Sequence, residues 1–352
     1  MSILVTGGAG FIGGNFVLDW LAHSDEPVIN LDKLTYAGNL LTLQPLAGDA
    51  RHHFVHGDIA DGELLRRLLQ QHRPRAVLNF AAESHVDRSI HGPDDFIATN
   101  IVGSYRLLET VRDYWQQLPP AEQAAFRLLQ VSTDEVYGSL TPDAPAFSEQ
   151  HRYQPSSPYA ASKAAADQLT HAWHHTYGLP VLTSHCSNNY GPYQFPEKLI
   201  PLVLHNALAD RPLPLYGDGQ QVRDWLYVAD HCAALRCVLA HGRPGEHYNV
   251  GGNCQLSNLE VVHTLCALLD ELRPGAAPYA RLIRFVADRP GHDRRYAIDA
   301  GKLQRELGWQ PAESFASGIR KTVQWYLANA DWVQSVTSGS YLDWTRRQYG
   351  AH

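Results

Sequence analysis

The sequence has little of what marks several large classes of protein. Its 36 Asp and Glu residues outnumber its 29 Lys and Arg residues, so the net charge of −7 gives no general attraction for nucleic acid or an anionic membrane. The 5 cysteines are odd in number and lack the paired spacing of a zinc site. No apolar run is long enough to cross a membrane, and no leader pattern precedes the first strand. We therefore expect a cytoplasmic protein whose phosphate binding, if any, is local.

Short apolar segments alternate with helical patterns through the first half of the chain. This alternation predicts parallel strands joined by crossover helices, an α/β fold with a doubly wound sheet of the Rossmann type. The expected strands cover residues 3–5, 28–31, 54–55, 76–80 and 128–131. The expected covering helices cover residues 10–22, 61–72, 100–117 and 159–177, which contain no internal proline.

From about Tyr190 the chain changes character, because prolines and Gly191 divide it into shorter segments. We expect two lobes, over residues 1–189 and 190–352, the second being smaller and of mixed α/β structure. A helical pattern at about 224–241 and an apolar segment at 246–250 indicate that residues 224–250 return to the first sheet. The lobes are thus expected to be interleaved. A last helix is expected near 313–328.

A glycine-rich segment follows the first expected strand directly. Gly7, Gly10 and Gly13 fit GxxGxxG, and Gly8 completes a GxGxxG in the same segment, between a strand and a helix. Glycine lets the backbone approach a pyrophosphate, whose charge is met by N–H groups at the helix N-terminus. The segment predicts a dinucleotide site, and the alternative is a glycine turn without a ligand.

Asp32 at the end of the second strand favours NAD over NADP. Its carboxylate can accept hydrogen bonds from the ribose hydroxyls of the adenosine and repel a 2′-phosphate, although the neighbouring Lys33 weakens that argument. Asp58 and Ile59 after the third strand are expected near the adenine, with a helix N-cap as the alternative for Asp58. Ala81 and Ala82 after the fourth strand let the chain pass close to the cofactor.

Tyr159 and Lys163 form a YxxxK pair at the start of an expected helix. The spacing of four residues puts both side chains on one face, where the ammonium group can lower the pKa of the phenol. The tyrosinate can then take a hydroxyl proton while a hydride leaves the neighbouring carbon, and Lys163 can hold the nicotinamide ribose. The alternative is a surface tyrosine beside a solvated lysine.

Thr133, Asp134 and Glu135 follow the strand at 128–131, at the carboxyl edge where doubly wound sheets bind ligands. Two adjacent carboxyls repel each other, which raises one pKa and divides the pair into an acid and a base. Simple alcohol oxidation needs neither group. In the alternative interpretation Asp134 caps a turn and Glu135 is solvated.

Taken together, seven motifs resemble those of the dTDP-glucose 4,6-dehydratases, a family of the extended short-chain dehydrogenase/reductase superfamily. They are TGGAGFIG, AAESHVDRSI at 81–90, STDEVYG, the YxxxK pair, NNYGPYQFPEKLIP at 188–201, YGDGQQVRDWLYVAD and DRPGHDRRYAID, and they span nearly the whole chain. The Thr-Asp-Glu segment is the most specific, because epimerases and decarboxylases of the superfamily carry other residues there.

This resemblance implies a three-stage reaction with bound NAD, in a pathway to a deoxysugar such as rhamnose. Tyr159, helped by Thr133, takes the proton of the 4-hydroxyl as the sugar is oxidised at C4. Glu135 then removes the C5 proton while Asp134 protonates the departing C6 hydroxyl. The hydride returns to C6 and gives a 4-keto-6-deoxy sugar. Ser132 is an alternative to Thr133.

The resemblance also implies most of the remaining binding residues. Arg223 is expected on the diphosphate, since a guanidinium group matches phosphate oxygens, with pairing to Asp224 or Asp230 as the structural alternative. Further cofactor contacts are implied for Phe11, Ile12, Leu34, Thr35, Phe80, Ser84, Thr99 and Asn189. Substrate contacts are implied for Ser84, Asn188, Lys198, Leu199, Pro214, Leu215, Tyr216, Asn258, Asp288, Arg289, Pro290, Gly291 and His292.

Several histidines are expected to have no catalytic role. A structural hydrogen bond is the favoured interpretation for His85, and His292 has an ordinary surface histidine as its alternative. His171, His174 and His175 have metal-binding spacing but no nearby carboxylate or cysteine, so no metal is expected. The apolar excess on helices 100–117 and 159–177 predicts a homodimer through a four-helix bundle. The rival functions are another nucleotide-sugar enzyme and a non-catalytic NAD-sensing protein.

Overall fold

A seven-stranded parallel sheet organises the first lobe. The computed structural model describes residues 1–288 and 291–337 of the 352. The strand order β10-β6-β5-β4-β1-β2-β3 reverses direction between β1 and β4, as in a doubly wound Rossmann sheet, so the predicted fold class is confirmed. The sheet strands are β1 (Ile3–Thr6), β2 (Val28–Asp32), β3 (His52–His56), β4 (Ala76–Asn79), β5 (Arg127–Thr133), β6 (Val181–Cys186) and β10 (His247–Val250).

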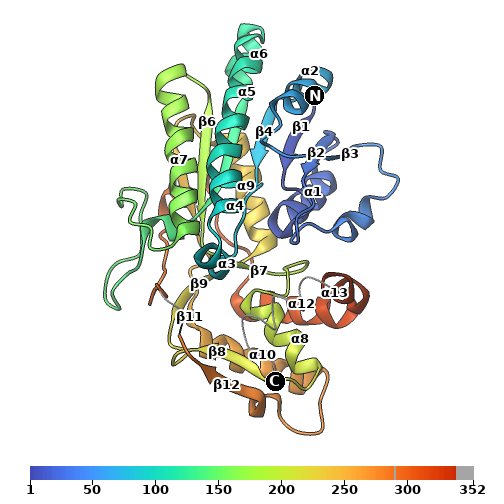
Figure 1. Ribbon diagram of the computed structural model, residues 1–352, viewed down its shortest axis with the longest axis vertical. Helices are drawn as coiled ribbons and strands as arrows, with labels where there is room; N and C mark the ends of the chain where they lie inside the picture. Colours follow the sequence, from blue (N-terminus) through green and yellow to red (C-terminus); the bar gives the residue numbers. More distant parts are fainter. Residues whose placement is uncertain (289–290, 338–352) are drawn as a thin grey trace.

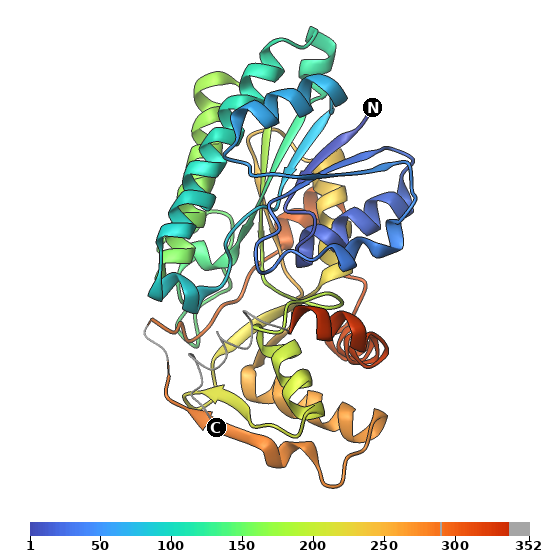
Figure 2. The same ribbon diagram turned by 45° about the vertical axis from the view of Figure 1, so that its right-hand side comes forward.

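Helices cover both faces of this sheet (Figures 1 and 2). Alternate residues of one strand serve the two layers: Ile3 and Val5 face α1 and α9, whereas Leu4 faces the α2 and α5 side. The helices of this lobe are α1 (Phe11–His23), η1 (Leu40–Leu46), α2 (Gly62–His72), α3 (Val86–His91), α4 (Asp94–Phe96), η2 (Ile97–Gly103), α5 (Ser104–Gln116), α6 (Pro120–Ala125), η3 (Asp134–Tyr137), α7 (Pro158–Tyr177), α9 (Val228–His241) and α11 (Gly301–Leu307).

A second lobe lies at the carboxyl edge of the sheet (Figure 2). It has its own apolar core, which includes Leu204, Leu265 and Val323. The strands form two small sheets, ordered β11-β9-β7 and β12-β8. Its elements are β7 (Asn188–Tyr190), α8 (Leu199–Leu208), β8 (Leu213–Tyr216), β9 (Val222–Tyr227), β11 (Gln255–Ser257), α10 (Asn258–Leu272), η4 (Tyr279–Leu282), β12 (Ile283–Val286), α12 (Phe315–Ala328) and α13 (Ala330–Val336).

The chain returns to the large sheet after its first passage through the second lobe. β10 pairs with β6 in parallel, from His247 beside Thr183 to Val250 beside Cys186. Residues 224–227, expected at the start of a helix, belong to β9 instead, and α9 begins at Val228. Segments from both sides of residue 189 thus contribute to the large sheet, whereas the two lobe ranges themselves stay a prediction.

Two other expected elements differ in detail. The helix expected over 100–117 begins earlier, with the wide π-helical turn η2 (Ile97–Gly103) leading into α5. Asn100 lies in that turn, and its side chain bonds the backbone of Glu83 in both directions at 2.9 and 3.0 Å. The helix expected near 313–328 is α12, which begins two residues later, after Ser314 caps it through the N–H of Ser317.

Candidate active site

The glycines of the first loop keep the floor of a pocket open at the switch point of the sheet. Gly7 has a φ of +72°, and a Cβ there would lie 2.6 Å from the backbone nitrogen of Ala81. A Cβ on Gly13 would lie 2.2 Å from the carbonyl oxygen of Gly7. No side chain caps α1 at Gly10, so the first N–H groups of the helix are free to meet an anion. The loop has the geometry of a pyrophosphate cradle.

Asp32 lies at the edge of the same pocket with its carboxylate fixed. Its two oxygens accept the N–H groups of Ala9, at 2.8 Å, and Leu34, at 2.7 Å. Burial raises the pKa of Asp32, and these two amides oppose that effect. Lys33 forms an ion pair with Asp58, the Nζ to Oδ2 distance being 2.8 Å. Lys33, which weakened the argument for NAD over NADP, is thus paired with the carboxylate of Asp58.

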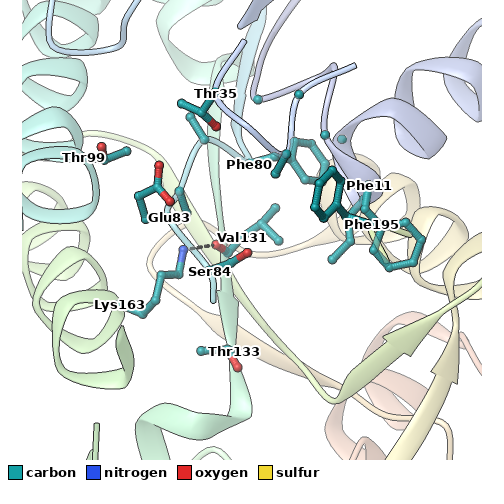
Figure 3. Close-up of a pocket in the computed structure, with 18 of the residues that line it drawn as sticks. Phe11, Thr35, Phe80, Glu83, Ser84, Thr99, Val131, Thr133, Lys163 and Phe195 are labelled. Atoms are coloured by element: carbon teal, nitrogen blue, oxygen red, sulfur yellow. Dashed lines mark hydrogen bonds between the residues drawn. The ribbon is translucent and has the colours of Figure 1, made fainter. Parts of the chain in front are cut away.

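Two interpretations for this region can be compared with the structure, the alternative given for Asp58 and the cofactor contact implied for Leu34. Asp58 does not cap the following helix, because Asp61 does so by accepting the N–H groups of Glu63 and Leu64. Leu34 does not line the pocket, since its N–H instead holds Asp32. The other residues expected at the cofactor do line it: Gly7, Gly10, Phe11, Ile12, Gly13, Asp32, Lys33, Thr35, Asp58, Ile59, Phe80, Ala81, Ala82, Ser84, Thr99, Tyr159, Lys163 and Asn189. Figure 3 labels six of them, Phe11, Thr35, Phe80, Ser84, Thr99 and Lys163.

Tyr159 and Lys163 enter the pocket from the start of α7. Lys163 donates from Nζ to the carbonyl oxygen of Val131 at 2.7 Å, the bond drawn in Figure 3. Burial raises the pKa of Tyr159 well above its ordinary value, Glu135 adds to the rise, and a hydrogen bond with Thr133 opposes it. Burial therefore outweighs any lowering of this pKa by Lys163, and the lowering itself stays a prediction. The spacing of four residues places Lys163 near Tyr159, but burial of the phenol has the largest effect on its pKa.

The direction in which each side chain leaves β5 shows whether Ser132 or Thr133 faces Tyr159. Neighbouring residues of β5 point to opposite faces, and Ser132 donates to Asp167 Oδ2 at 2.6 Å. Thr133 lines the pocket and hydrogen-bonds Tyr159. Its Oγ1 also accepts the N–H of Glu135 at 3.3 Å, which caps the short helix η3. Thr133 is consequently the hydroxyl that faces the tyrosine.

Asp134 and Glu135 occupy different environments at the start of η3. Asp134 is 2% exposed, and its Oδ2 has no hydrogen-bond partner among the described residues. Burial raises the pKa of Asp134 well above its ordinary value, and the charges of Glu135 and Asp224 add to this. Glu135 is only half-buried and lines the main pocket and a second one. Asp134 therefore holds its proton more tightly than an ordinary carboxyl does, in the direction that the carboxyl pair predicted.

The second pocket joins the first at Glu135 and opens into the second lobe. The expected substrate residues that line it are Asn188, Lys198, Leu199, Pro214, Leu215, Tyr216, Arg223, Asn258 and His292, and Ser84 and Thr133 line the first pocket. Asp288 and Gly291 line neither pocket. Asp288 instead lies behind His292, with 2.6 Å between its Oδ1 and the histidine Nδ1. Arg289 and Pro290 lie outside the described residues.

Arg223 is held with its guanidinium group at the second pocket. It donates to the carbonyl oxygens of Val222 and Asp293, at 2.8 and 3.0 Å, and stacks 4.4 Å from the ring centre of Tyr296. The carboxylates considered as its structural partners have other tasks. Asp224 accepts the N–H groups of residues 252 and 254, and Asp230 accepts those of residues 312 and 313. These contacts favour a ligand-binding role for Arg223.

Two interpretations of the histidines can be compared with the structure, those of His85 and His292. His85 caps α3 by accepting the N–H of Arg88 at 3.3 Å, a structural bond. The side chain of His292 is 5% exposed, so it is not an ordinary surface histidine. His174 bonds the carbonyl oxygen of Leu179. Within residues 1–288 and 291–337, no group of three or more His, Cys, Asp or Glu side chains is arranged to hold a metal.

Some lining residues were not predicted, above all Glu197. It lines both pockets, and burial raises its pKa to about 7 while Lys198 and Arg88 oppose the rise. Tyr36 donates to its Oε1 at 3.2 Å, and Arg88 Nε lies 3.4 Å from its Oε2. The sequence could have pointed to Glu197, because it is the one acidic residue in the apolar, proline-rich segment 191–201. The other residues of the main pocket that were not predicted are Leu31, Ala37, Gly38, Gly57, Glu83, Val131, Cys186, Ser187, Gln194 and Phe195.

Comparisons with known proteins agree on one kind of enzyme. A family model described as GDP-mannose 4,6 dehydratase matches residues 4–322. A dTDP-glucose 4,6-dehydratase of Xanthomonas campestris pv. campestris is 65% identical over 340 residues, 96% of each chain. One of Salmonella typhimurium is 56% identical over 357 residues, 99% of each chain.

Solved structures give the same picture. The dTDP-glucose 4,6-dehydratase DesIV of Streptomyces venezuelae, solved with NAD and TYD bound, is 48% identical, with a TM-score of 0.87 over 96% of this chain and 100% of that one. A UDP-glucose 4-epimerase of Thermus thermophilus, in complex with NAD, is 30% identical, with a TM-score of 0.81 over 94% and 100% of the two chains. The fold is thus shared more widely than the activity.

Proposed function

The chain belongs to the GDP-mannose 4,6 dehydratase family, and among its members to the dTDP-glucose 4,6-dehydratases, and we propose that five residues of its main pocket divide the reaction between them. They are Thr133, Asp134, Glu135, Tyr159 and Lys163. The activity is the NAD-dependent conversion of dTDP-glucose to dTDP-4-keto-6-deoxyglucose and water. How these residues carry it out follows from their contacts.

The pocket fits NAD. Gly7 and Gly13 leave room that a Cβ would fill, and the start of α1 has N–H groups for a pyrophosphate. Asp32 presents a fixed carboxylate where ribose hydroxyls would lie, and its neighbour Lys33 is paired with Asp58. When bound, NAD supplies the acceptor that takes a hydride from the sugar and later gives it back.

Oxidation at C4 requires a group that removes the 4-hydroxyl proton, and Tyr159 is placed to do so. Thr133 hydrogen-bonds the phenol and lowers its pKa, whereas burial raises it. A positive charge brought into the buried pocket favours the tyrosinate, because opposite charges attract strongly where water is excluded. Lys163, held by Val131, supplies one such charge from the same face of α7.

Elimination across C5 and C6 requires a base and an acid at the same time. Glu135 is half-buried at the junction of the two pockets, where the sugar must lie between cofactor and diphosphate sites, and serves as the base. Asp134 is buried and its pKa is raised well above the ordinary value, so it is the carboxyl of the pair suited to carry a proton and donate it to the departing hydroxyl oxygen. No metal is needed for this division of roles.

The single observation that supports the proposal best is the buried carboxyl of Asp134, with its raised pKa, beside Glu135. A sugar epimerase needs Tyr159 and Lys163 but no acid and base pair, and a cofactor-sensing protein needs none of the four. The test is to mix the purified protein with dTDP-glucose without added NAD and analyse the product. A 4-keto-6-deoxy sugar nucleotide is expected. A C4 epimer, or no product from protein that holds NAD, would reject the assignment of roles.

Arg223 is proposed to bind the diphosphate of the substrate through its planar guanidinium group. The variant Arg223→Lys keeps the charge but loses the two-pronged hydrogen bonding and the stacking on Tyr296. We expect KM for the nucleotide sugar to rise about tenfold, with a smaller change in kcat, since ground-state binding is what is lost. Steady-state kinetics measures this. The matched control is Arg320→Lys, an exposed arginine paired with Glu271, for which KM should not change.

A homodimer is proposed through the outer face of α5 and α7, which lie side by side in Figure 1. Ile97, Val102 and Tyr105 are 46%, 45% and 36% exposed along η2 and the start of α5, and Tyr177 at the end of α7 is 41% exposed. Large apolar side chains gathered on one helical face favour a four-helix contact with a second copy.

The variant Val102→Glu tests this dimer. A charge buried against a second copy is costly, so the variant should sediment as a monomer at micromolar concentration while the unaltered protein sediments as a dimer. Val286→Glu, in the second lobe, is the control and should leave the sedimentation unchanged. A monomeric unaltered protein in analytical ultracentrifugation would contradict the proposal.

The setting of the enzyme is also a proposal. Its 5 cysteines are all unpaired, which suits a reducing cytoplasm, and the product suits a pathway to a deoxysugar such as rhamnose. In residues 1–288 and 291–337 no helix is both long and apolar enough to cross a membrane.

A further inference from the structure

A third residue of α7 shares the buried face that carries the catalytic pair. Tyr159, Lys163 and Asp167 are spaced one helical turn apart, and all three are at most 8% exposed. Tyr159 and Lys163 line the main pocket, whereas Asp167 lines neither pocket. The reaction as described gives this carboxylate no task, yet a buried carboxylate is costly to keep.

Asp167 is fixed by groups from three other segments. Its Oδ2 accepts hydrogen bonds from Ser132 Oγ of β5 at 2.6 Å and from the hydroxyl of Tyr153 at 3.4 Å, and it lies 3.2 Å from His185 Nε2 of β6. Tyr153 lies 2.7 Å from the same histidine nitrogen. The other oxygen, Oδ1, is buried and has no hydrogen-bond partner within the described residues. Hydrogen bonds thus fix Oδ2 of the carboxylate, whereas Oδ1 accepts none from the described residues.

Lys163 is the buried cation that this carboxylate can act on. The two side chains do not form a direct ion pair, since Nζ donates to the carbonyl oxygen of Val131 at 2.7 Å. Burial lowers the pKa of Lys163, and the charge of Asp167 is the largest influence that opposes it, followed by the Cys186 thiol of β6. The titratable groups that face Asp167 in turn include Tyr153, His185 and Tyr137, whose pKa the charge of Asp167 helps to raise.

We propose that Asp167 is a positioning residue of the reaction, whose fixed carboxylate keeps the ammonium group of Lys163 charged and in place beside Tyr159. Ser132 ties this carboxylate to the residue before Thr133, so that one buried acid supports both the lysine and the hydroxyl that flank the tyrosine. Asp167 acts through these residues and does not touch the substrate. The proposal rests on the role given above to Lys163.

The charge of Lys163 can be read directly, because the chain has only five lysines, at positions 33, 163, 198, 302 and 321. With lysine labelled at 13Cε, the signal that disappears in Lys163→Arg identifies the residue, and its chemical shift is followed against pH in the NAD-bound protein. We expect Lys163 to be charged at neutral pH in the unaltered protein. A signal that is already neutral there would overturn the proposal without any further variant, and this readout does not depend on turnover.

Asp167→Asn then removes the charge while keeping the shape. We expect the titration midpoint of Lys163, and the alkaline limb of kcat against pH, to move to lower pH by about one unit or more, because an opposite charge is lost from a buried site. Asp167→Ser is a second uncharged variant with room for a water, and Asp167→Glu should retain the unaltered limb.

The matched control is Thr170→Val, which removes a buried polar group on the same helix but no charge. It should leave the titration of Lys163 unchanged. If Asp167 were merely structural, its uncharged variants would melt at lower temperature while the midpoint and the limb stayed with those of the unaltered protein. An unchanged midpoint and an unchanged limb in either Asp167→Asn or Asp167→Ser would overturn the proposal.

Discussion

Glu135→Gln is expected to stop the reaction after the first hydride transfer. The amide is nearly the size of the carboxylate but cannot take the C5 proton, so turnover should fall by about 10²- to 10⁴-fold. Removal of the 4-hydroxyl proton by Tyr159 is untouched, and the oxidised sugar has no way forward. The near-ultraviolet absorbance of reduced cofactor should therefore build up on the enzyme when dTDP-glucose is added, as followed by stopped-flow spectroscopy.

The control for this variant is Glu122→Gln, an exposed carboxylate paired with Arg73 far from the site. It should turn over like the unaltered enzyme without lasting absorbance. Normal turnover by Glu135→Gln would show that another group is the base. Half-buried Glu135 is the carboxylate best placed for this role, because burial raises the pKa of Asp134 and suits that residue to the role of the acid.

Tyr159→Phe should show the opposite pattern, a block before any hydride moves. Only the hydroxyl is lost, and the ring keeps its edge contact with Phe96, so the fold should be preserved. Without the base for the 4-hydroxyl, turnover should fall by about 10²- to 10⁴-fold and no reduced cofactor should accumulate. The same stopped-flow experiment distinguishes the two variants.

Tyr177→Phe at the exposed end of α7 is the control and should behave as the unaltered enzyme. If Tyr159→Phe accumulated reduced cofactor, the tyrosine would not be the group that removes the 4-hydroxyl proton. Thr133 would then be the next residue to change, since it hydrogen-bonds the tyrosine in the same pocket.

The parts of the site that could be predicted from sequence are those whose geometry is local. The spacing of Tyr159 and Lys163 places both on one face of α7, and the glycines at 7 and 13 leave space for a ligand by having no Cβ. Asp134 beside Glu135 predicted that one of two neighbouring carboxyls would have a raised pKa, and burial raises that of Asp134, while the acid and base roles stay a prediction. Each of these predictions depends only on residues that are close together in the sequence.

What could not be predicted depends on segments that meet only in the folded chain. Glu197 reaches the pocket from the second lobe, and its hydrogen-bond partner Tyr36 lies 161 residues earlier. The pKa of Tyr159 was expected to fall because of Lys163, but spacing gives proximity and says nothing of burial, which raises it. The choice between Ser132 and Thr133 likewise needed the face of β5 that each occupies.

The return of the chain to the large sheet at β10 sets an order for synthesis on the ribosome. β6 can pair with β5 once residue 186 has emerged, but its other edge has no partner until residues 247–250 follow. Until then a strand edge with free N–H and C=O groups is open to a neighbouring nascent chain. Sixty residues lie between the two strands, and they include β7, α8, β8 and β9 of the second lobe. The newborn chain therefore needs protection from aggregation at β6 throughout this interval.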